Sequence, residues 1–162
     1  MPIPSIIERA GEGGLARQAG AAAQAALAHS FVEAQYVWTS FLLEHLVAVR
    51  RRLGDLDTAL LLTVIGLSAL KAAQAGKPPD TTVNAHSLAL ITGIPRETVR
   101  RKLAALGRRG WIEPAPGGGW RLTLEADDQA PAQRELEGIT AETNLRLARL
   151  VEQLVRIGLP AD

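Results

Sequence analysis

The stretch 84–106 contains two short helix-forming segments that are separated by a glycine and a proline. Asn84 is a good N-cap residue, so we expect a short helix directly after it. Gly93 suits the left-handed conformation that often ends a helix. Pro95 has a fixed φ and no backbone donor, and it therefore fits the first turn of a following helix. The pattern predicts two helices joined by a tight turn.

The apolar residues of both segments recur at helical spacing. The first helix is expected to turn three side chains inward, namely Leu88, Ile91 and Ala85. The second helix, at about 95–106, should bury Val99, Leu103 and Leu106, which are four and three residues apart. Two short helices joined by a glycine-containing turn form a helix-turn-helix, whose second helix fits a DNA major groove.

A short hairpin is expected after the second helix. Trp111 and Ile112 precede a Pro- and Gly-rich tip, and Leu122 and Leu124 follow it. Bulky apolar residues around a turn-rich tip are typical of paired strands. We expect Trp111 and Trp120 to pack, and we expect the tip at 116–121 to approach a duplex closely.

This arrangement resembles the winged helix-turn-helix of bacterial transcription regulators of the MarR, GntR and DeoR families. The resemblance covers about a quarter of the chain and rests on these residues: Thr92, Gly93, Ile94, Arg96, Thr98, Val99, Arg100, Arg101, Leu103, Leu106, Gly110, Trp111 and Ile112. Such families usually have Ser or Thr where Pro95 stands, so no hydroxyl contact to phosphate is expected at that position.

Charge is concentrated around the second helix. The chain carries a net charge of only +1, but 96–109 has one acidic residue, Glu97, among these cations: Arg96, Arg100, Arg101, Lys102, Arg108 and Arg109. A locally basic segment on a nearly neutral chain is typical of a localised phosphate-contacting face.

The family pattern and this charge predict a DNA-binding surface. Arg96, Thr98 and Arg100 match positions that contact bases or phosphates in those families, and an arginine at the helix start can reach guanine O6 and N7 together. Arg101 and Lys102 are expected on phosphate. In the wing, the expected contacts are Gly117, Gly118 and Arg121.

Long helices are expected on both sides of this motif. An amphipathic helix should span 30–53, a nearly all-apolar core helix should span 56–75 after an Asp55 or Asp57 cap, and a last helix should span 132–158. From Thr143 the last helix has alternating steps of four and three, which is the seam of a helix pair. Its partner is the first long helix or the same helix of a second subunit. This order resembles the MarR layout more than the GntR one.

The expected fold is therefore mainly α: a winged helix-turn-helix with a small β-hairpin wing, flanked by long N- and C-terminal dimerisation helices. Residues 1–20 are expected to form a flexible arm. Residues 21–162 are expected to form one domain, with 21–75 and 132–159 as the dimerisation and core part and 80–125 as the DNA-binding part.

The first long helix carries most of the aromatic residues outside the wing, although aromatics make up only 4% of the chain. They are Phe31, Tyr36, Trp38 and Phe41. One interpretation is core and dimer packing. The other is the wall of a pocket for a small apolar or aromatic effector, as the MarR resemblance implies.

Composition excludes several kinds of chemistry. The chain has no cysteine, so thiolate catalysis, thiolate metal sites and disulfides are excluded. His29, His45 and His86 lack metal-ligand spacing, and no carboxylate pair or activated serine stands out. We expect no metal, no cofactor and no enzymatic activity.

The expected location is cytoplasmic and nucleoid-associated. No secretory signal pattern is seen, and the apolar run 59–70 is too short for a membrane span. The predicted function is a sequence-specific, dimeric transcription regulator, expected to be a repressor, that binds double-stranded DNA. The alternative is a winged-helix protein for protein contact or for plasmid or chromosome maintenance, with little DNA sequence preference.

Overall fold

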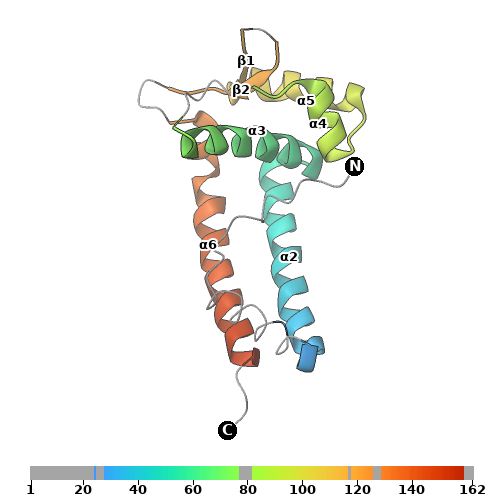
Figure 1. Ribbon diagram of the computed structural model, residues 1–162, viewed down its shortest axis with the longest axis vertical. Helices are drawn as coiled ribbons and strands as arrows, with labels where there is room; N and C mark the ends of the chain where they lie inside the picture. Colours follow the sequence, from blue (N-terminus) through green and yellow to red (C-terminus); the bar gives the residue numbers. More distant parts are fainter. Residues whose placement is uncertain (1–23, 25–27, 77–81, 117, 126–128, 159–162) are drawn as a thin grey trace. The chain divides into compact units, whose positions relative to one another are not determined.

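The computed structural model describes residues 24, 28–76, 82–116, 118–125 and 129–158. The chain is mainly helical with a small two-stranded antiparallel hairpin, which confirms the mainly α prediction (Figure 1). The elements are α2 (Phe31–Leu53), α3 (Leu56–Gln74), α4 (Ala85–Thr92), α5 (Arg96–Arg108), β1 (Ile112–Pro114), β2 (Trp120–Leu122) and α6 (Pro131–Gly158). The arm predicted at 1–20 lies outside the described residues.

The chain divides into two compact units. Unit 1 consists of Met1–Leu46 and Ala141–Asp162, and unit 2 consists of Val47–Thr140. Unit 2 therefore contains α3, α4, α5 and the hairpin, together with the end of α2 and the beginning of α6. The expected grouping placed 21–75 together with the last helix. The observed grouping differs because the apolar residues of α3 pack against α4 and α5.

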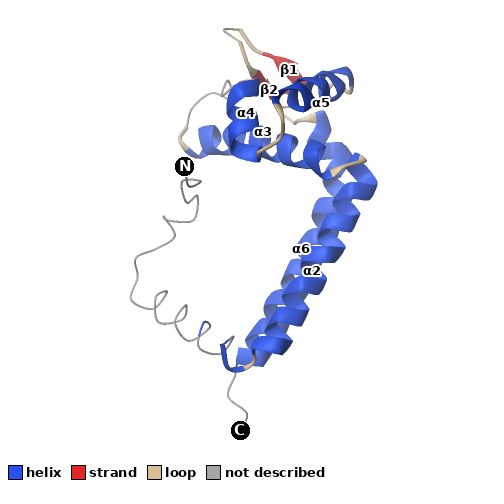
Figure 2. Ribbon diagram, turned by 90° about the vertical axis from the view of Figure 1, so that its right-hand side faces the viewer, coloured by secondary structure: helices blue, strands red, loops and turns tan. Residues whose placement is uncertain are grey.

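Unit 2 is built around α3. In two views at right angles, α4, α5 and the hairpin lie on one side of this helix (Figures 1 and 2). Leu61 and Ile65 of α3 are fully buried there. They pack with α4, α5 and hairpin residues, which include Leu88, Val99, Leu103, Leu106, Trp111 and Ile112. The predicted inward positions of α5 are confirmed.

The two short helices meet at the predicted turn. Asn84 caps α4 by accepting a 2.8 Å hydrogen bond from the backbone N–H of Ser87. Gly93 ends α4 with a φ of 72°, which a residue with a Cβ rarely adopts. Pro95 is the N-cap of α5 and not part of its first turn, because its ψ of 138° is extended.

One of the three residues of α4 that were predicted to face inward, Ile91, is exposed instead. Ile91 of α4 is 49% exposed, whereas Leu88 is buried and Ala85 and Ala89 are partly buried. In a helix of eight residues the side that meets the core is narrow, and a step of three from Leu88 moves Ile91 off that side.

A third segment joins the hairpin. β1 and β2 pair antiparallel, with Ile112 opposite Leu122, and Val83 forms a bridge to Trp120 on the other side of β2. The bridge has two backbone hydrogen bonds of 2.9 and 3.0 Å. Gly119, at a φ of 115°, permits this approach, because a Cβ there would lie 3.1 Å from the Cβ of Thr82. The segment before α4 is thereby fastened to the hairpin.

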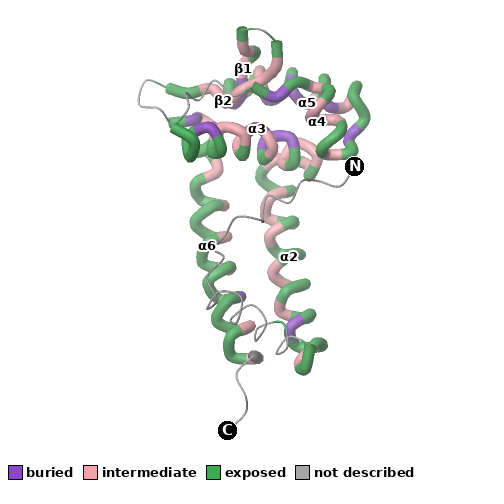
Figure 3. The backbone as a smooth tube through the Cα atoms, viewed as in Figure 1, coloured by how far each residue is buried: buried purple, intermediate pink, exposed green. Residues whose placement is uncertain are grey.

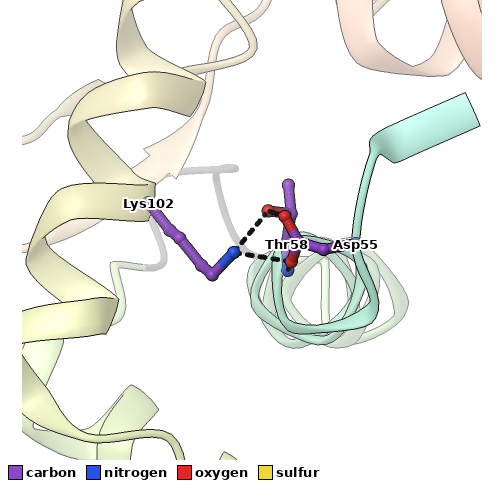
Figure 4. Close-up of polar contacts among 3 residues, drawn as sticks. All are labelled: Asp55, Thr58 and Lys102. Atoms are coloured by element: carbon purple, nitrogen blue, oxygen red, sulfur yellow. Dashed lines mark hydrogen bonds and ion pairs between the residues drawn. The ribbon is translucent and has the colours of Figure 1, made fainter. Parts of the chain in front are cut away.

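A partly buried ion pair joins the N-cap of α3 to α5 (Figure 4). Asp55 is the N-cap of α3 and accepts hydrogen bonds from the backbone N–H of Thr58 at 2.7 Å and from its hydroxyl at 2.9 Å. Lys102 Nζ lies 2.6 Å from Asp55 Oδ1, and the lysine side chain is only 15% exposed. Burial raises the pKa of Asp55, but the hydrogen bonds from Lys102 and Thr58 outweigh it and hold the pKa below its ordinary value of 3.8.

Replacement of Asp55 should therefore destabilise unit 2 in a pH-dependent way. Asp55→Ala is expected to lower the free energy of unfolding at pH 7 by about 1–2 kcal/mol, because the cap is removed and Lys102 is left unpaired. A lowered folded-state pKa stabilises the fold above pH 4 and loses this effect as pH falls below 4. The wild-type advantage in urea unfolding should shrink over that range. Asp57→Ala, beside the cap, is the control, and an equal loss from both variants would contradict the account.

The parts of α2 and α6 that belong to unit 2 are joined by Glu135. Its carboxylate accepts a hydrogen bond from Trp111 Nε1 at 3.0 Å and pairs with Arg109 at 2.7 Å, and its backbone carbonyl accepts one from Arg52 at 2.8 Å. The Arg109 guanidinium lies over the Trp111 ring at 3.7 Å. Trp111 packs as expected and is 1% exposed.

In unit 1, α2 and α6 lie side by side and antiparallel (Figure 1). His45 Nδ1 is 3.2 Å from Thr143 Oγ1, and Glu44 contacts Arg146 at 3.8 Å. Ala34 and Leu150 are buried, but much of the remaining surface of both helices is exposed (Figure 3). Of the two partners that were expected for the last helix, the first long helix is the one that contacts it within the chain.

The prediction that the apolar run 59–70 is too short to span a membrane considered only part of the helix that contains it. The apolar run 59–70 is part of α3, which has 19 residues and is long and apolar enough to cross a membrane by length and composition alone. A core helix meets the same criterion, and α3 places Leu61, Leu62, Ile65 and Ala72 among its buried residues.

Candidate nucleic-acid interface

One side of α5 is basic and exposed. The opposite side, with Val99, Leu103 and Leu106, lies in the core of unit 2, so the orientation of the helix in this unit is fixed by burial. The exposed residues of α5 are Arg96, Glu97, Arg100, Arg101, Ala104, Ala105 and Arg108 (Figure 3). No bulky apolar residue stands among them, and the two alanines leave the middle of the helix open to close approach by a partner.

Arg96 is held at the start of this surface. Its Nη2 contacts the Nδ1 of His86, which lies in the first turn of α4. Arginine has only donors, so His86 Nδ1 is the acceptor in this contact. The sequence showed only that His86 lacks metal-ligand spacing, and nothing in that spacing indicates a contact ten residues away across the turn.

Arg100 and Arg101 flank a hollow beside the hairpin. The hollow is about 590 Å³ in volume, and its lining also includes Ala85 of α4 and Trp120 of β2. Trp120 packs closely over α5 at Gly107, where a Cβ would meet its ring at 3.3 Å. Arg100 also forms an exposed pair with Glu97 at 3.3 Å, a type of contact that contributes little and is readily exchanged.

The other predicted α5 contacts are placed differently. Thr98 is half-buried at the beginning of the helix. Lys102, expected on phosphate, instead forms the partly buried pair with Asp55 and donates to the Thr58 hydroxyl at 3.3 Å. Spacing along α5 could not predict this pair, because the carboxylate that Lys102 contacts is 47 residues away in the sequence.

The hairpin brings one charged pair next to its tip. Arg121 lies opposite Glu113 in the strand register, and its Nε and Nη2 are 2.8 and 2.7 Å from Glu113 Oε1. Glu113 therefore neutralises much of the charge of Arg121, which was predicted to contact DNA. Gly118 is exposed at the tip with a φ of 88°, and Gly117 lies outside the described residues.

The aromatic residues of α2 do not gather around one hollow. Phe31, Tyr36 and Trp38 are 63%, 73% and 45% exposed. The Phe41 ring is stacked with His45, with centroids 6.1 Å apart, and is tilted by 34° against the Trp38 ring, with centroids 6.0 Å apart. A shallow hollow of about 410 Å³ lies between α2 and α6 in unit 1, and of these four residues only Tyr36 lines it. An effector pocket built from all four remains a prediction.

Within the described ranges, no group of three or more His, Asp or Glu side chains is placed to hold a metal ion. No family model matches the chain, and no curated protein or solved structure matches it either.

Proposed function

We propose that this protein is a winged-helix transcription regulator that binds double-stranded DNA as a homodimer, with α5 in the major groove. The expected mode of action is repression by occupation of a pseudo-palindromic operator. The observation that carries the proposal is the exposed basic side of α5, whose opposite side is anchored in the core of unit 2.

The order of elements in unit 2 supports a winged helix. The core helix α3 comes first and is followed by Val83, which bridges to the hairpin. The two short helices α4 and α5 come next, and the hairpin β1–β2 comes last. The Val83 bridge makes β2 the middle of three paired segments, and the Gly93 turn joins α4 to α5. This is the arrangement that a helix-turn-helix with a wing requires.

The charges of α5 divide between two roles in this proposal. Arg96 begins the helix, and its contact with His86 limits its freedom before DNA arrives, so it is the best placed to read a guanine. Arg100 and Arg101 line the hollow beside the hairpin and supply phosphate or base contacts. Lys102 has no part in DNA contact in this proposal, because its charge is already paired with Asp55.

Binding as a dimer follows from the geometry of DNA. One α5 helix contacts only a few base pairs, whereas two copies related by a twofold axis place their helices in successive major grooves, about 34 Å apart. A symmetric protein then selects a pseudo-palindromic site. The exposed apolar residues of α2 and α6 support association of two copies.

Binding to a duplex should depend steeply on salt. If Arg100, Arg101 and equivalent cations of a second copy neutralise about four to six phosphates, the log of the association constant should fall against log salt with a slope of roughly −4 to −5. Fluorescence anisotropy of a labelled duplex, titrated at several salt concentrations, gives this slope. A duplex that does not bind at low salt would rule out the proposed function.

A further inference from the structure

The side of α3 that faces away from the core of unit 2 is uncharged and exposed. Leu61 and Ile65 face the core, and the residues on the opposite side of the helix follow alternating steps of four and three. The four leucines among them are 37%, 47%, 43% and 62% exposed. We call this row the outer seam of α3, and its members are Leu56, Leu60, Thr63, Leu67, Leu70 and Gln74. Steps of four and three are the spacing with which one helix packs lengthwise against another.

One flank of the outer seam consists of small residues. Gly66 lies beside the middle of the seam, and a Cβ at this position would meet no atom within 4 Å. Glycine destabilises the middle of a helix relative to alanine, and the packing of its own chain does not require it here. Ala59 and Ala73 lie on the same flank, seven residues before and after Gly66. This flank is therefore open to close approach by a second helix.

The other flank of the outer seam carries opposite charges at its two ends. Asp57 lies in the first turn of α3 and Lys71 in its last turn, and neither forms an ion pair with another residue that the structure describes. If two such helices pack antiparallel, Asp57 of each lies close to Lys71 of the other. A parallel pair offers neither residue an opposite charge, so the charges favour the antiparallel arrangement.

We propose that the outer seam of α3 packs against the outer seam of a second copy, with the two helices antiparallel about a twofold axis level with position 65. One register satisfies the leucines, the small flank and the charges together, and this self-complementarity points to a second copy of the chain as the partner. Across the axis, the facing positions are Leu60 with Leu70, Leu67 with Thr63, Leu56 with Gln74, Gly66 with Gly66 and Asp57 with Lys71.

This pairing is separate from the association of α2 and α6, and it has its own consequence for DNA. The buried side of α5 faces the core beside α3, its basic side faces away, and the outer seam lies on the far side of α3 (Figures 1 and 2). Two copies joined at α3 therefore turn their α5 helices away from each other and hold two duplexes side by side. This consequence rests on the proposed function, whereas the pairing itself does not.

The first test captures the pairing with a disulfide. An interface of one helix from each copy is small and is expected to be weak, so a covalent bond is the suitable reporter. The chain has no cysteine, and Gly66→Cys places one thiol beside the axis, where its side chain has space. Ala73→Cys is the control on the same flank, because its thiol lies about 24 Å along the helix from that of the second copy. Under mild oxidation Gly66→Cys should form the covalent dimer about tenfold faster or more.

A charge in the seam shows whether the seam causes this difference. In the Gly66→Cys chain, Leu60→Glu should slow dimer formation to the rate of Ala73→Cys. Leu90→Glu, at an exposed leucine of α4, should leave the rate unchanged. Equal rates for Gly66→Cys and Ala73→Cys, or a rate that Leu60→Glu does not reduce while the helical circular dichroism is retained, would overturn the proposal.

A capture assay tests the consequence for DNA. Protein on an immobilised duplex should retain a second, labelled duplex, and Leu60→Glu should lose the second duplex while still binding the first. Retention of the second duplex by Leu60→Glu would refute bridging through α3. A chain that crosslinks at position 66 but binds no duplex would refute the proposed function alone, whereas one that binds duplexes but does not crosslink would refute the α3 pairing alone.

Discussion

Trp111→Ala is expected to lower the free energy of unfolding by about 3–5 kcal/mol, the cost of truncating a large buried aromatic residue. The indole is 1% exposed, its Nε1 donates to Glu135, and the Arg109 guanidinium lies over its ring at 3.7 Å. Because many domains are stable by only about 5–15 kcal/mol, this loss would leave unit 2 close to unfolding. Urea unfolding followed by circular dichroism gives the value.

Two control variants separate the contributions at this position. Trp111→Phe keeps an aromatic ring under Arg109 but removes the donor to Glu135, so its loss should be smaller than that of Trp111→Ala. Trp38→Ala removes the same side chain at a position that is 45% exposed in the single chain, and at concentrations where the chain is monomeric it should cost far less. A loss below about 1 kcal/mol from Trp111→Ala would contradict the packing of the hairpin against α5 and α6.

Removal of the exposed arginines of α5 should abolish most of the DNA affinity. Arg96, Arg100 and Arg101 each supply a base or phosphate contact in the proposal, and one good bidentate base contact contributes about 1–3 kcal/mol. Their joint replacement by alanine is expected to weaken binding to the preferred duplex by roughly 1,000-fold, about 4 kcal/mol. The slope against log salt should become shallower by about 0.9 for each phosphate that the variant no longer neutralises.

The matched control removes the same charge elsewhere. Arg51, Arg149 and Arg156 are exposed and lie on α2 and α6. Their joint replacement by alanine should change affinity by less than about tenfold, because steering by net charge is weak at moderate salt. Anisotropy titrations of both variants at one salt concentration make the comparison. Equal reductions in affinity would mean that total charge, and not the α5 surface, determines binding.

Local chemistry was sufficient to predict most of the secondary structure. The Asn84 cap, the Gly93 turn and the buried side of α5 depend on neighbouring residues, so spacing and residue type predicted them. The limits of α2, α3 and α6 were also within a few residues of the observed ones. Ile91 was misplaced because a short helix offers too few residues to define its inward side.

Contacts between distant residues were not predictable in the same way. The Lys102–Asp55 pair, the Glu135 contacts with Trp111 and Arg109, and the Val83 bridge each join segments that only the fold brings together. A single bridging residue has no periodicity, and a lone lysine on a basic helix looks like its neighbours. The DNA-facing role of the remaining arginines stays a prediction that geometry supports.

The most direct measurement is selection of bound sequences from a random duplex pool by the full-length protein, followed by competition of the enriched sequence against the unselected pool. A winged-helix dimer predicts enrichment of a pseudo-palindromic site whose half-sites lie about one helical turn apart, with affinity at least about 100-fold above the pool. Binding without enrichment would favour a maintenance or architectural role with little sequence preference. No recovered DNA at low salt would contradict the account altogether.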